Sequence, residues 1–375
     1  MPDTSTDPAI SRVFDAPEPH EATGEATLED VSESSEPSLG RRFLQPRTLI
    51  SFVLAAVIVF FVFRGLNIDI GSVWTRVKAA NPWYLIGGFA SFYVAIALRG
   101  WRWRLMLDRV GVNPEHGLKT PSVGSSTEMV ILSLFANCVV PARLGDAYRG
   151  YLLKQRSGAS FAVGLGTILA ERLIDVIVMV AVVVVAGIAV FGTHVPGRAE
   201  HAFLLGLAVV VIGILGSIVL FFLSDHIEAR IPERLTGHFR RVNKGIFDIL
   251  AKPIPFAAIG ILIWSLDGLR VFLVARALGT EISIQDATVV SLLSALVTIV
   301  PFTPAGLGIV EGFMIWMLAQ VGVGHDSAAA IALLDRSITY LSLIVVGLPL
   351  YAIHLKREAT VVAASKSVPT PEVAS

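Results

Sequence analysis

The chain has little cysteine, little histidine and little charge for its length, and each shortage excludes a class of protein. Of its 375 residues, one is cysteine and eight are histidine, which excludes a disulfide framework and argues against a metal site. The single thiol, Cys138, lies in an apolar run, so we expect it to be buried and unreactive. Charged residues make up only 16% of the chain and hydrophobic residues 54%, whereas soluble domains carry about 25% charge. The composition therefore excludes a soluble globular protein.

Motifs that would mark an enzyme are also missing. The sequence contains no HExxH zinc motif, no Walker A loop and no GxSxG nucleophile turn. The step Gly306-Leu307-Gly308 is too short for a nucleotide-binding fingerprint. We therefore expect no catalytic residues, no cofactor, no metal and no nucleic acid partner.

The two ends of the chain differ from its middle. Residues 1–40 hold ten Asp and Glu against one base, Arg12, and are rich in Ser, Thr and Pro. Such a segment cannot bury enough apolar surface to offset its ordering entropy, so it is predicted to be a disordered acidic tail. It is not a signal peptide, because its start is acidic and no apolar core follows directly. Residues 360–375 are predicted to form a mobile C-terminal tail, which leaves 45–355 as a polytopic membrane domain.

Long apolar runs dominate the middle of the chain. Six of them approach the roughly 20 residues that a helix needs to span a bilayer; they cover roughly residues 48–65, 82–100, 160–192, 202–223, 254–278 and 327–354. Two further pieces, 127–156 and 284–321, are interrupted by proline and glycine. We interpret both as re-entrant hairpins, because a membrane tolerates broken helices only where protein or a water-filled cavity satisfies their backbone. The predicted fold class is all-α integral membrane, a helical bundle with six full spans and two re-entrant hairpins.

Basic residues indicate how the bundle is oriented, since cytoplasmic loops are enriched in Lys and Arg. Basic clusters precede the first span, follow the second (Arg102, Arg104 and Arg109), occupy the 224–253 loop and follow the last span. Placing all four in the cytoplasm also places both termini there, although Arg64, Arg76 and Lys78 then lie outside. Three full spans separate the hairpins, so the hairpins enter from opposite faces and form an inverted repeat. The match of Leu98-Arg99 with Leu269-Arg270 supports the repeat.

Two segments near the membrane surface have simpler interpretations. Residues 226–252 carry apolar side chains every fourth position, which suits an amphipathic helix on the inner leaflet or a plain cytoplasmic linker helix. A group of aromatic residues is typical of the interfacial belt of membrane proteins; it comprises Trp83, Tyr84, Trp101 and Trp103.

The first hairpin break joins structural residues to charged ones. Pro141 and Gly145 interrupt the helix, and Arg143, Asp146 and Arg149 follow at a spacing that puts them near one helix face. Guanidinium groups bind phosphate bidentately, and helix N-termini add positive potential. A phosphate-bearing headgroup would suit this arrangement; the alternative is that the two arginines are ordinary anchors at the inner leaflet.

The second break repeats the pattern with different residues. The structural breaks there are Pro301, Pro304, Gly306 and Gly308. Glu311 either lines this break or caps the helix that follows it, since an acid in the first turn favours the helix dipole.

Charged residues inside the apolar helices complete the set of candidates. Glu171, Arg172 and Asp175 in the first half have counterparts in Asp335 and Arg336, and an ionisable residue at membrane depth is a functional-site hypothesis by default. The alternative is that each acid neutralises a nearby arginine and locks helices together. Asp267 and Arg270 are assigned to packing.

Together these motifs resemble the flippase-like membrane domain of lysylphosphatidylglycerol synthases, the UPF0104-type family. The resemblance covers about residues 45–355 and is carried by three patterns: Asn137-x-x-x-Pro141-x-Arg143-x-Gly145-Asp146-x-x-Arg149, Glu171-Arg172-x-x-Asp175 and Pro301-x-x-Pro304-x-Gly306-x-Gly308-x-x-Glu311. It implies a domain that moves a membrane lipid across the cytoplasmic membrane. It also implies headgroup contacts at Asn137, Arg143, Asp146, Arg149, Glu171, Arg172, Asp175, Glu311, Asp335 and Arg336.

The resemblance also bears on partners. It implies self-association as a homodimer, and because the soluble aminoacyl-transfer domain of the synthases does not follow the membrane region here, it leaves room for a separate synthase partner. The sequence thus favours a translocase for a phosphate-bearing lipid, such as aminoacyl-phosphatidylglycerol or a polyprenyl-linked lipid. The alternatives are a scaffold or regulatory subunit of an envelope lipid enzyme and a transferase acting on lipid-linked substrates.

Overall fold

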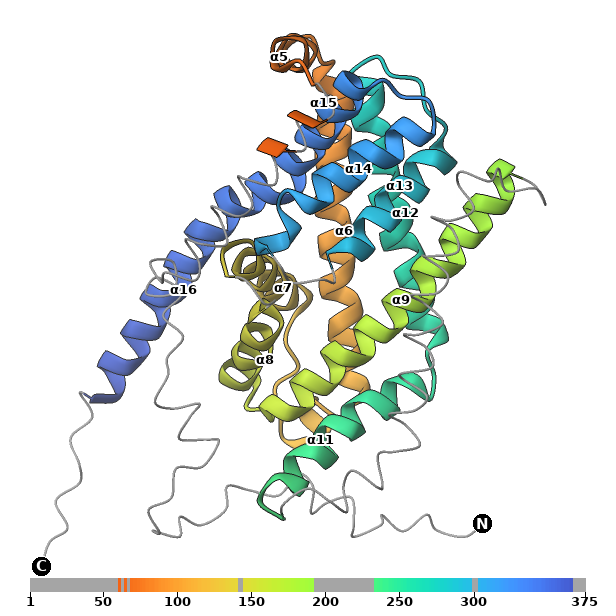
Figure 1. The fold of residues 1–375 in the computed structure, drawn as a ribbon. Coiled ribbons are helices and arrows are strands. Elements are labelled where there is room, and N and C mark those ends of the chain that lie inside the picture. Colours follow the sequence, from red (N-terminus) through yellow and green to blue (C-terminus); the bar gives the residue numbers. More distant parts are fainter. Residues whose placement is uncertain are drawn as a thin grey trace, which may run out of the picture.

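The computed structural model describes residues 60–61, 64–65, 68–140, 144–191, 233–298 and 303–366, and these residues form helices and turns without strands (Figure 1). Several expectations fall outside them, namely those on residues 1–40, on most of 48–65, on 202–223, on residues 367–375, and on Pro141, Arg143 and Pro301.

Long helices form where the apolar runs predict them. Within the described residues, three helical stretches are long and apolar enough to cross a membrane: Pro82–Arg109, Ile254–Ala277 and His325–Arg357. The first is α6 and the second is α12. A further helix of 31 residues, α9 (Phe161–Phe191), contains Glu171, Arg172 and Asp175. The chain is thus an all-helical membrane protein.

The last stretch is a composite of three helical segments. It consists of α15 (His325–Arg336), a π-helical turn over Ser337–Leu341 and α16 (Ser342–Lys366). Helix α16 therefore continues beyond residue 360, where the sequence predicts the start of the C-terminal tail. Single π-helical turns inside helices occur frequently at functional sites, and this one directly follows Asp335 and Arg336.

Both interrupted pieces form hairpins of two short helices. The first consists of α7 (Val123–Val139) and α8 (Leu144–Ser157), and the second of α13 (Ile284–Val297) and α14 (Ile309–Gln320). Within each hairpin the two helices pack against each other. The prediction that each piece is interrupted and consists of two short helices is therefore confirmed.

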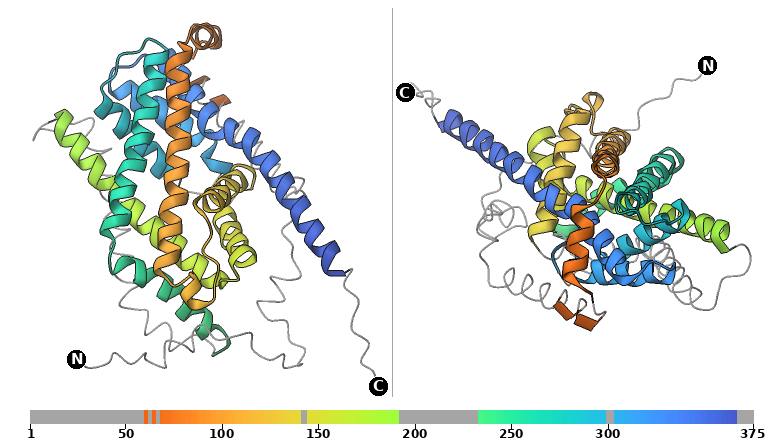
Figure 2. Two further views of the ribbon diagram at one scale, coloured as in Figure 1. Left: turned by 180° about the vertical axis from the view of Figure 1, so that it is seen from behind. Right: turned by 90° about the horizontal axis from the view of Figure 1, so that it is seen from above.

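The hairpins lie toward opposite ends of the bundle. Helix α6 runs from the end marked by α5 (Ile70–Lys78) toward the end marked by α11 (Glu233–Leu250), and α12 runs the opposite way (Figures 1 and 2). The α7–α8 hairpin lies toward α11, and the α13–α14 hairpin lies toward α5. Their breaks meet between these ends, because the short turn Pro304–Gly306 contacts α7 and the Tyr340 hydroxyl donates to the Cys138 carbonyl at 2.9 Å.

Helix packing follows the same plan in both halves. Helix α6 packs on α7 as α12 packs on α13, and α8 packs on α9 as α14 packs on α15. The halves join where α6 meets α12, where α9 meets α13 and where α16 meets α7. Since α6 and α12 run in opposite directions, the repeat is inverted, as the sequence predicts.

Two glycines align the halves residue by residue. A Cβ on Gly100 would lie 2.6 Å from the Thr127 Cα, and a Cβ on Gly268 would lie 2.9 Å from the Thr288 Cα. Only glycine permits such close approach of neighbouring helices. Gly268 is therefore the counterpart of Gly100, and Arg270 is the counterpart of Arg102. The sequence analysis aligned Arg99 with Arg270, which is three residues out of register. A match of two residues does not show which face of each helix packs against its neighbour, whereas the two glycines do.

The amphipathic segment also forms a helix. Its helix, α11, packs along α9, and Ile249 on it is fully buried. The apolar side chains of α11 are therefore explained at least in part by contact with α9.

Replacing Gly100 by alanine tests the close packing of α6 on α7. The added methyl group cannot be accommodated by a side-chain rotation alone, because backbone atoms of Thr127 block it. We expect the free energy of unfolding to fall by about 1–3 kcal/mol, measured by thermal unfolding in detergent. Gly268→Ala should act similarly. Gly124→Ala, where the nearest atom lies 3.9 Å away, should leave the stability unchanged, and a large loss there would contradict the packing account.

Cys138 provides a direct test of the depth of the first break. It is the single cysteine of the chain, and it is 3% exposed at the end of α7. A bulky impermeant maleimide added to either side of the membrane should leave it unmodified, and denaturation in detergent should make it reactive. Rapid labelling of the folded protein from one side would place the break at the membrane surface instead.

Candidate functional site

A cavity lined by both charged and apolar residues lies where the two breaks meet. It has a volume of about 240 Å³ and is lined by α6, α7, α9, α12, α13 and the residues around both breaks. Its walls include many apolar groups, but its charged residues are mainly cationic. They are Arg99, Arg149, Arg172, Arg270 and Arg336 against Glu171, Asp267 and Asp335.

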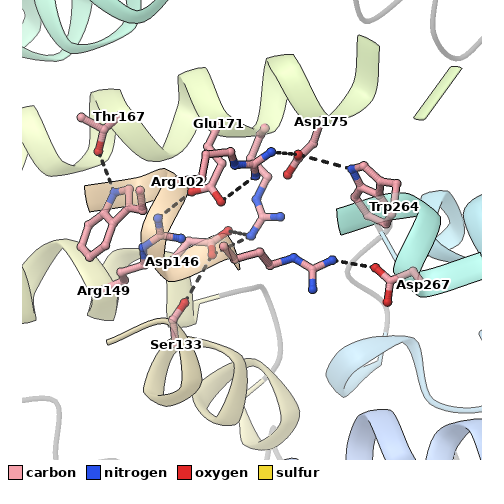
Figure 3. Close-up of polar contacts among 12 residues, drawn as sticks. Arg102, Ser133, Asp146, Arg149, Thr167, Glu171, Asp175, Trp264 and Asp267 are labelled. Carbon is pink, nitrogen blue, oxygen red and sulfur yellow. Dashed lines mark hydrogen bonds and ion pairs between the residues drawn. The ribbon is translucent and has the colours of Figure 1, made fainter. Parts of the chain in front are cut away.

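The first half holds its acids between arginines from other helices (Figure 3). Arg102 on α6 donates to Glu171 at 2.9 Å and to Asp175 at 2.7 Å, both on α9. Arg149 on α8 donates to the second oxygen of Glu171 at 2.6 Å. Trp264 on α12 adds a hydrogen bond to Asp175 at 3.3 Å. Helices α6, α8, α9 and α12 are therefore joined by one buried network.

Two residues assigned to the membrane surface belong to this network. Arg102 is fully buried, so its place among the cytoplasmic basic residues is a wrong prediction. The reason is that α6 extends to Arg109, which leaves Arg102 inside the helix with its face toward α9. Trp103 is also fully buried, donates to the Thr167 hydroxyl at 3.1 Å and packs its ring 3.9 Å from the guanidinium of Arg149. Trp83, Tyr84 and Trp101 are exposed, and their place in an interfacial belt stays a prediction.

A second ion pair secures the start of α8. Arg172 donates to both oxygens of Asp146, at 3.0 and 3.3 Å, and the Ser133 hydroxyl approaches Asp146 at 3.5 Å. The side chain of Asn137 accepts a hydrogen bond from the Gly145 N–H at 2.9 Å. Asn137 therefore holds the break together while also lining the cavity.

The second half contains an equivalent network. Arg270 on α12 binds Asp267 on the same helix and Asp335 on α15, the latter at 2.7 Å. Arg99 on α6 binds the other oxygen of Asp267 at 2.7 Å. Arg99, Asp267 and Arg270 all line the cavity. Asp267 and Arg270 also form the pair on one helix face that their spacing permits. Their side chains point inward because Gly100 and Gly268 set the packed faces of α6 and α12.

Arg336 and Glu311 hold the second break. Arg336 donates to Glu311 at 2.8 Å and to the Ala305 carbonyl at 2.8 Å, and Glu311 also accepts from the Gly308 N–H at 2.6 Å. Glu311 thus caps α14, which confirms the capping interpretation, and it also pairs with an arginine; it is not among the residues that line the cavity. Ala305 has a left-handed backbone with φ 48°, a conformation that costs a non-glycine residue about 1 kcal/mol or more. The hydrogen bond from Arg336 offsets part of that cost.

Adjacent charges in the sequence do not pair with each other in space. Glu171 binds Arg102 and Arg149, whereas its neighbour Arg172 binds Asp146. Asp335 and Arg336 divide in the same way between Arg270 and Glu311. Consecutive residues of a helix point about 100° apart, so each reaches a different neighbouring helix. The two halves therefore repeat the ion pairs as well as the helices.

The described network is balanced in charge. It contains six arginines and six carboxylates: Arg99, Arg102, Arg149, Arg172, Arg270 and Arg336, with Asp146, Glu171, Asp175, Asp267, Glu311 and Asp335. Among the residues described, no group of three or more His, Cys, Asp or Glu could hold a metal ion. The cavity wall itself carries five arginines and three carboxylates, so it presents an excess of positive charge to a ligand.

Comparisons with known proteins agree on one family. The family model described as lysylphosphatidylglycerol synthase TM region matches residues 48–347. A UPF0104 membrane protein of Methanocaldococcus jannaschii is 30% identical over 57% of this chain and 92% of its own length. A UPF0104 membrane protein of Methanothermobacter thermautotrophicus is 24% identical over 84% of this chain and 95% of its own length. A relative named glycosyltransferase AglD, from Haloferax volcanii, is 25% identical over 78% of this chain but 52% of its own length.

Removing Arg102 should destabilise the protein strongly. Arg102→Met leaves Asp175 buried without its arginine and removes one of the two arginines of Glu171, and breaking a buried pair costs about 3–5 kcal/mol. Adding Asp175→Asn should recover part of that loss, because the uncompensated charge disappears. The coupling is read from a double-mutant cycle on thermal unfolding. Arg109→Met, at the exposed end of the same helix, is the control, and purely additive effects of Arg102→Met and Asp175→Asn would contradict the pairing.

Proposed function

Because the chain belongs to the family of the lysylphosphatidylglycerol synthase membrane region, we propose that it is a translocase for a phosphate-bearing lipid. The observation that carries this proposal is the meeting of two oppositely oriented broken-helix hairpins around an arginine-lined cavity. Substrate sites of many transporters lie between inverted repeats at broken helices near the bilayer midplane. A membrane enzyme or a simple helical bundle needs no such paired breaks.

The chemistry of the wall supports a phosphate ligand. Arg149, Arg172 and Arg336 reach the cavity from α8, α9 and α15, and arginine binds phosphate through two parallel hydrogen bonds. The apolar residues between them suit the start of a lipid chain. The cavity is smaller than a whole phospholipid, so the site would hold the headgroup while the chains stay in the membrane.

The inverted repeat also suggests how the headgroup would cross. If one hairpin and its supporting helices tilt against the other pair, the cavity opens first to one membrane face and then to the other. The ion pairs between the halves, such as Arg99 with Asp267, would exchange partners during this step. The sequence has no nucleotide-binding motif, so the proposed movement is downhill or coupled to an ion. We place the protein in the cytoplasmic membrane with both termini inside.

A scaffold role is the competing function, and one observation favours it. Every carboxylate of the described network is already bound by an arginine, which is also how helices are locked together. A transferase role has the name of one relative in its support, but that relative is about twice as long as the matched region. The proposed homodimer and a separate synthase partner are compatible with either transport or scaffolding.

Transport of labelled lipids in proteoliposomes tests the proposal. The panel holds phosphatidylglycerol, its aminoacyl form and a polyprenyl phosphate sugar, in vesicles of native lipid extract. We expect the wild-type protein to move one class, and Arg172→Met to slow that movement by about tenfold or more, as loss of a charge-assisted contact predicts.

The matched control is Arg156→Met. Arg156 also forms an ion pair, with Glu128 at 2.8 Å, but it does not line the cavity. Its replacement should leave transport unchanged. No movement of any lipid by folded wild-type protein would reject the translocase and favour the scaffold.

A further inference from the structure

The two halves repeat their helices but differ chemically at the cavity wall. Asp146 and Glu311 occupy the third position of α8 and α14, and each binds an arginine of the following helix. Three residues further on, α8 carries Arg149 and α14 carries Met314, and both line the cavity. Equivalent places are therefore cationic in one half and apolar in the other.

The residue that supports Arg149 differs in the same way. Trp103, whose ring packs against Arg149, directly follows Arg102. Its counterpart after Arg270 is Val271, which also lines the cavity. The second half therefore lacks both the arginine and the aromatic ring that would orient it.

Charges that face the cavity are distributed unevenly as well. The first half contributes Arg99, Arg149 and Arg172 against Glu171 alone, because Asp146 and Asp175 do not line the cavity. The second half contributes Arg270 and Arg336 against Asp267 and Asp335. The excess of positive charge thus lies on the first-half wall.

Arg149 is held in place at the cavity wall. It is 3% exposed, donates to Glu171 at 2.6 Å and packs on Trp103, which Thr167 fixes by a hydrogen bond. Its Nε is buried without a hydrogen-bond partner, as is the Nε of Arg172. The Nε of Arg102, which does not line the cavity, is in the same state. Because these Nε atoms have almost no accessible surface, a ligand in the cavity would contact Arg149 and Arg172 through other atoms of their side chains. Arg172 has a side chain that is 36% exposed, so it can approach a ligand.

We propose that the cavity holds one amphiphile in a single orientation, with its phosphate on Arg149 and Arg172 and its apolar chain against Met314 and Val310. This inference deepens the proposed function and rests on it. The ligand class is a lipid that carries a phosphate group next to its chains. The two halves therefore share a framework but form one anion site, on the first-half wall. The equivalent wall of the second half is apolar and would contact the lipid chain.

Binding to the full-length protein in detergent tests this orientation. The probes are dioctanoyl phosphatidylglycerol and its headgroup alone, glycerophosphoglycerol, measured by isothermal titration. We expect one binding site per chain for the lipid. Arg149→Met should weaken both probes by about tenfold or more, as loss of a charge-assisted hydrogen bond predicts. Met314→Asn should weaken the lipid and leave the headgroup probe unchanged.

Two further variants keep the test decisive. The double variant Arg149→Met/Glu171→Gln removes both charges of one ion pair, so neither charge is left buried without its partner and folding is protected. This double variant should still bind both probes weakly. Arg156→Met removes an arginine from the same helix outside the cavity and should bind normally.

Three results would overturn the proposal: two lipid sites of equal affinity, unchanged binding in the Arg149 variants, or equal effects of Met314→Asn on both probes. If the binding pattern holds while wild-type vesicles show no transport, the proposed function fails and the orientation of the ligand stands.

Discussion

Buried pairing of arginines with carboxylates from other helices is the constraint on which the rest of this structure depends. An isolated charge at membrane depth is expensive, so each arginine of the network must find an acid before its helix can be placed. Arg102 illustrates this most clearly, because it is fully buried and binds both Glu171 and Asp175. The pairs fix the rotation of α6, α8, α9, α12 and α15, and the cavity is the space that those rotations leave between two interrupted helices.

The inverted repeat makes this balance achievable twice within one chain. Arg102 with Glu171 corresponds to Arg270 with Asp335, and Arg172 with Asp146 corresponds to Arg336 with Glu311. The salt bridge of Arg99 with Asp267 then joins the halves across the contact between α6 and α12. Because both halves use the same framework, small changes such as Met314 in place of an arginine can make the site asymmetric without disturbing the fold.

Much of the fold follows from the sequence, since long apolar runs and Pro/Gly breaks are strong signals in a membrane protein. The positions of both hairpins and their opposite orientation were predictable from apolar length, Pro/Gly breaks and basic residues, whereas the full lengths of α6 and α16 were not. Of the candidate residues, the charged ones that the structure describes meet in the network. Asn137 binds the backbone of the first break instead, and Arg143 falls outside the described part of the chain. The sequence did not identify Arg99, Arg102, Trp103, Asp267 or Arg270 as part of the site.

Those residues were missed for two physical reasons. The length of α6 beyond the apolar run was not apparent, so residues inside a helix resembled a basic cluster and an aromatic belt at the membrane surface. Asp267 and Arg270, three residues apart, resembled a local pair, and only the packing at Gly268 reveals that they face Arg99 and Asp335. One signal could have identified Arg102 as buried. It lies near the end of an apolar run, and the residues after it favour a continuing helix.

The most direct test of the central claim is a structure of the protein in nanodiscs that contain phosphatidylglycerol. If the network builds a lipid site between the two breaks, density for a phosphate group should lie in the cavity beside the arginines of the first half. A cavity that is filled by protein side chains, with lipid bound only around the outside of the bundle, would contradict the account.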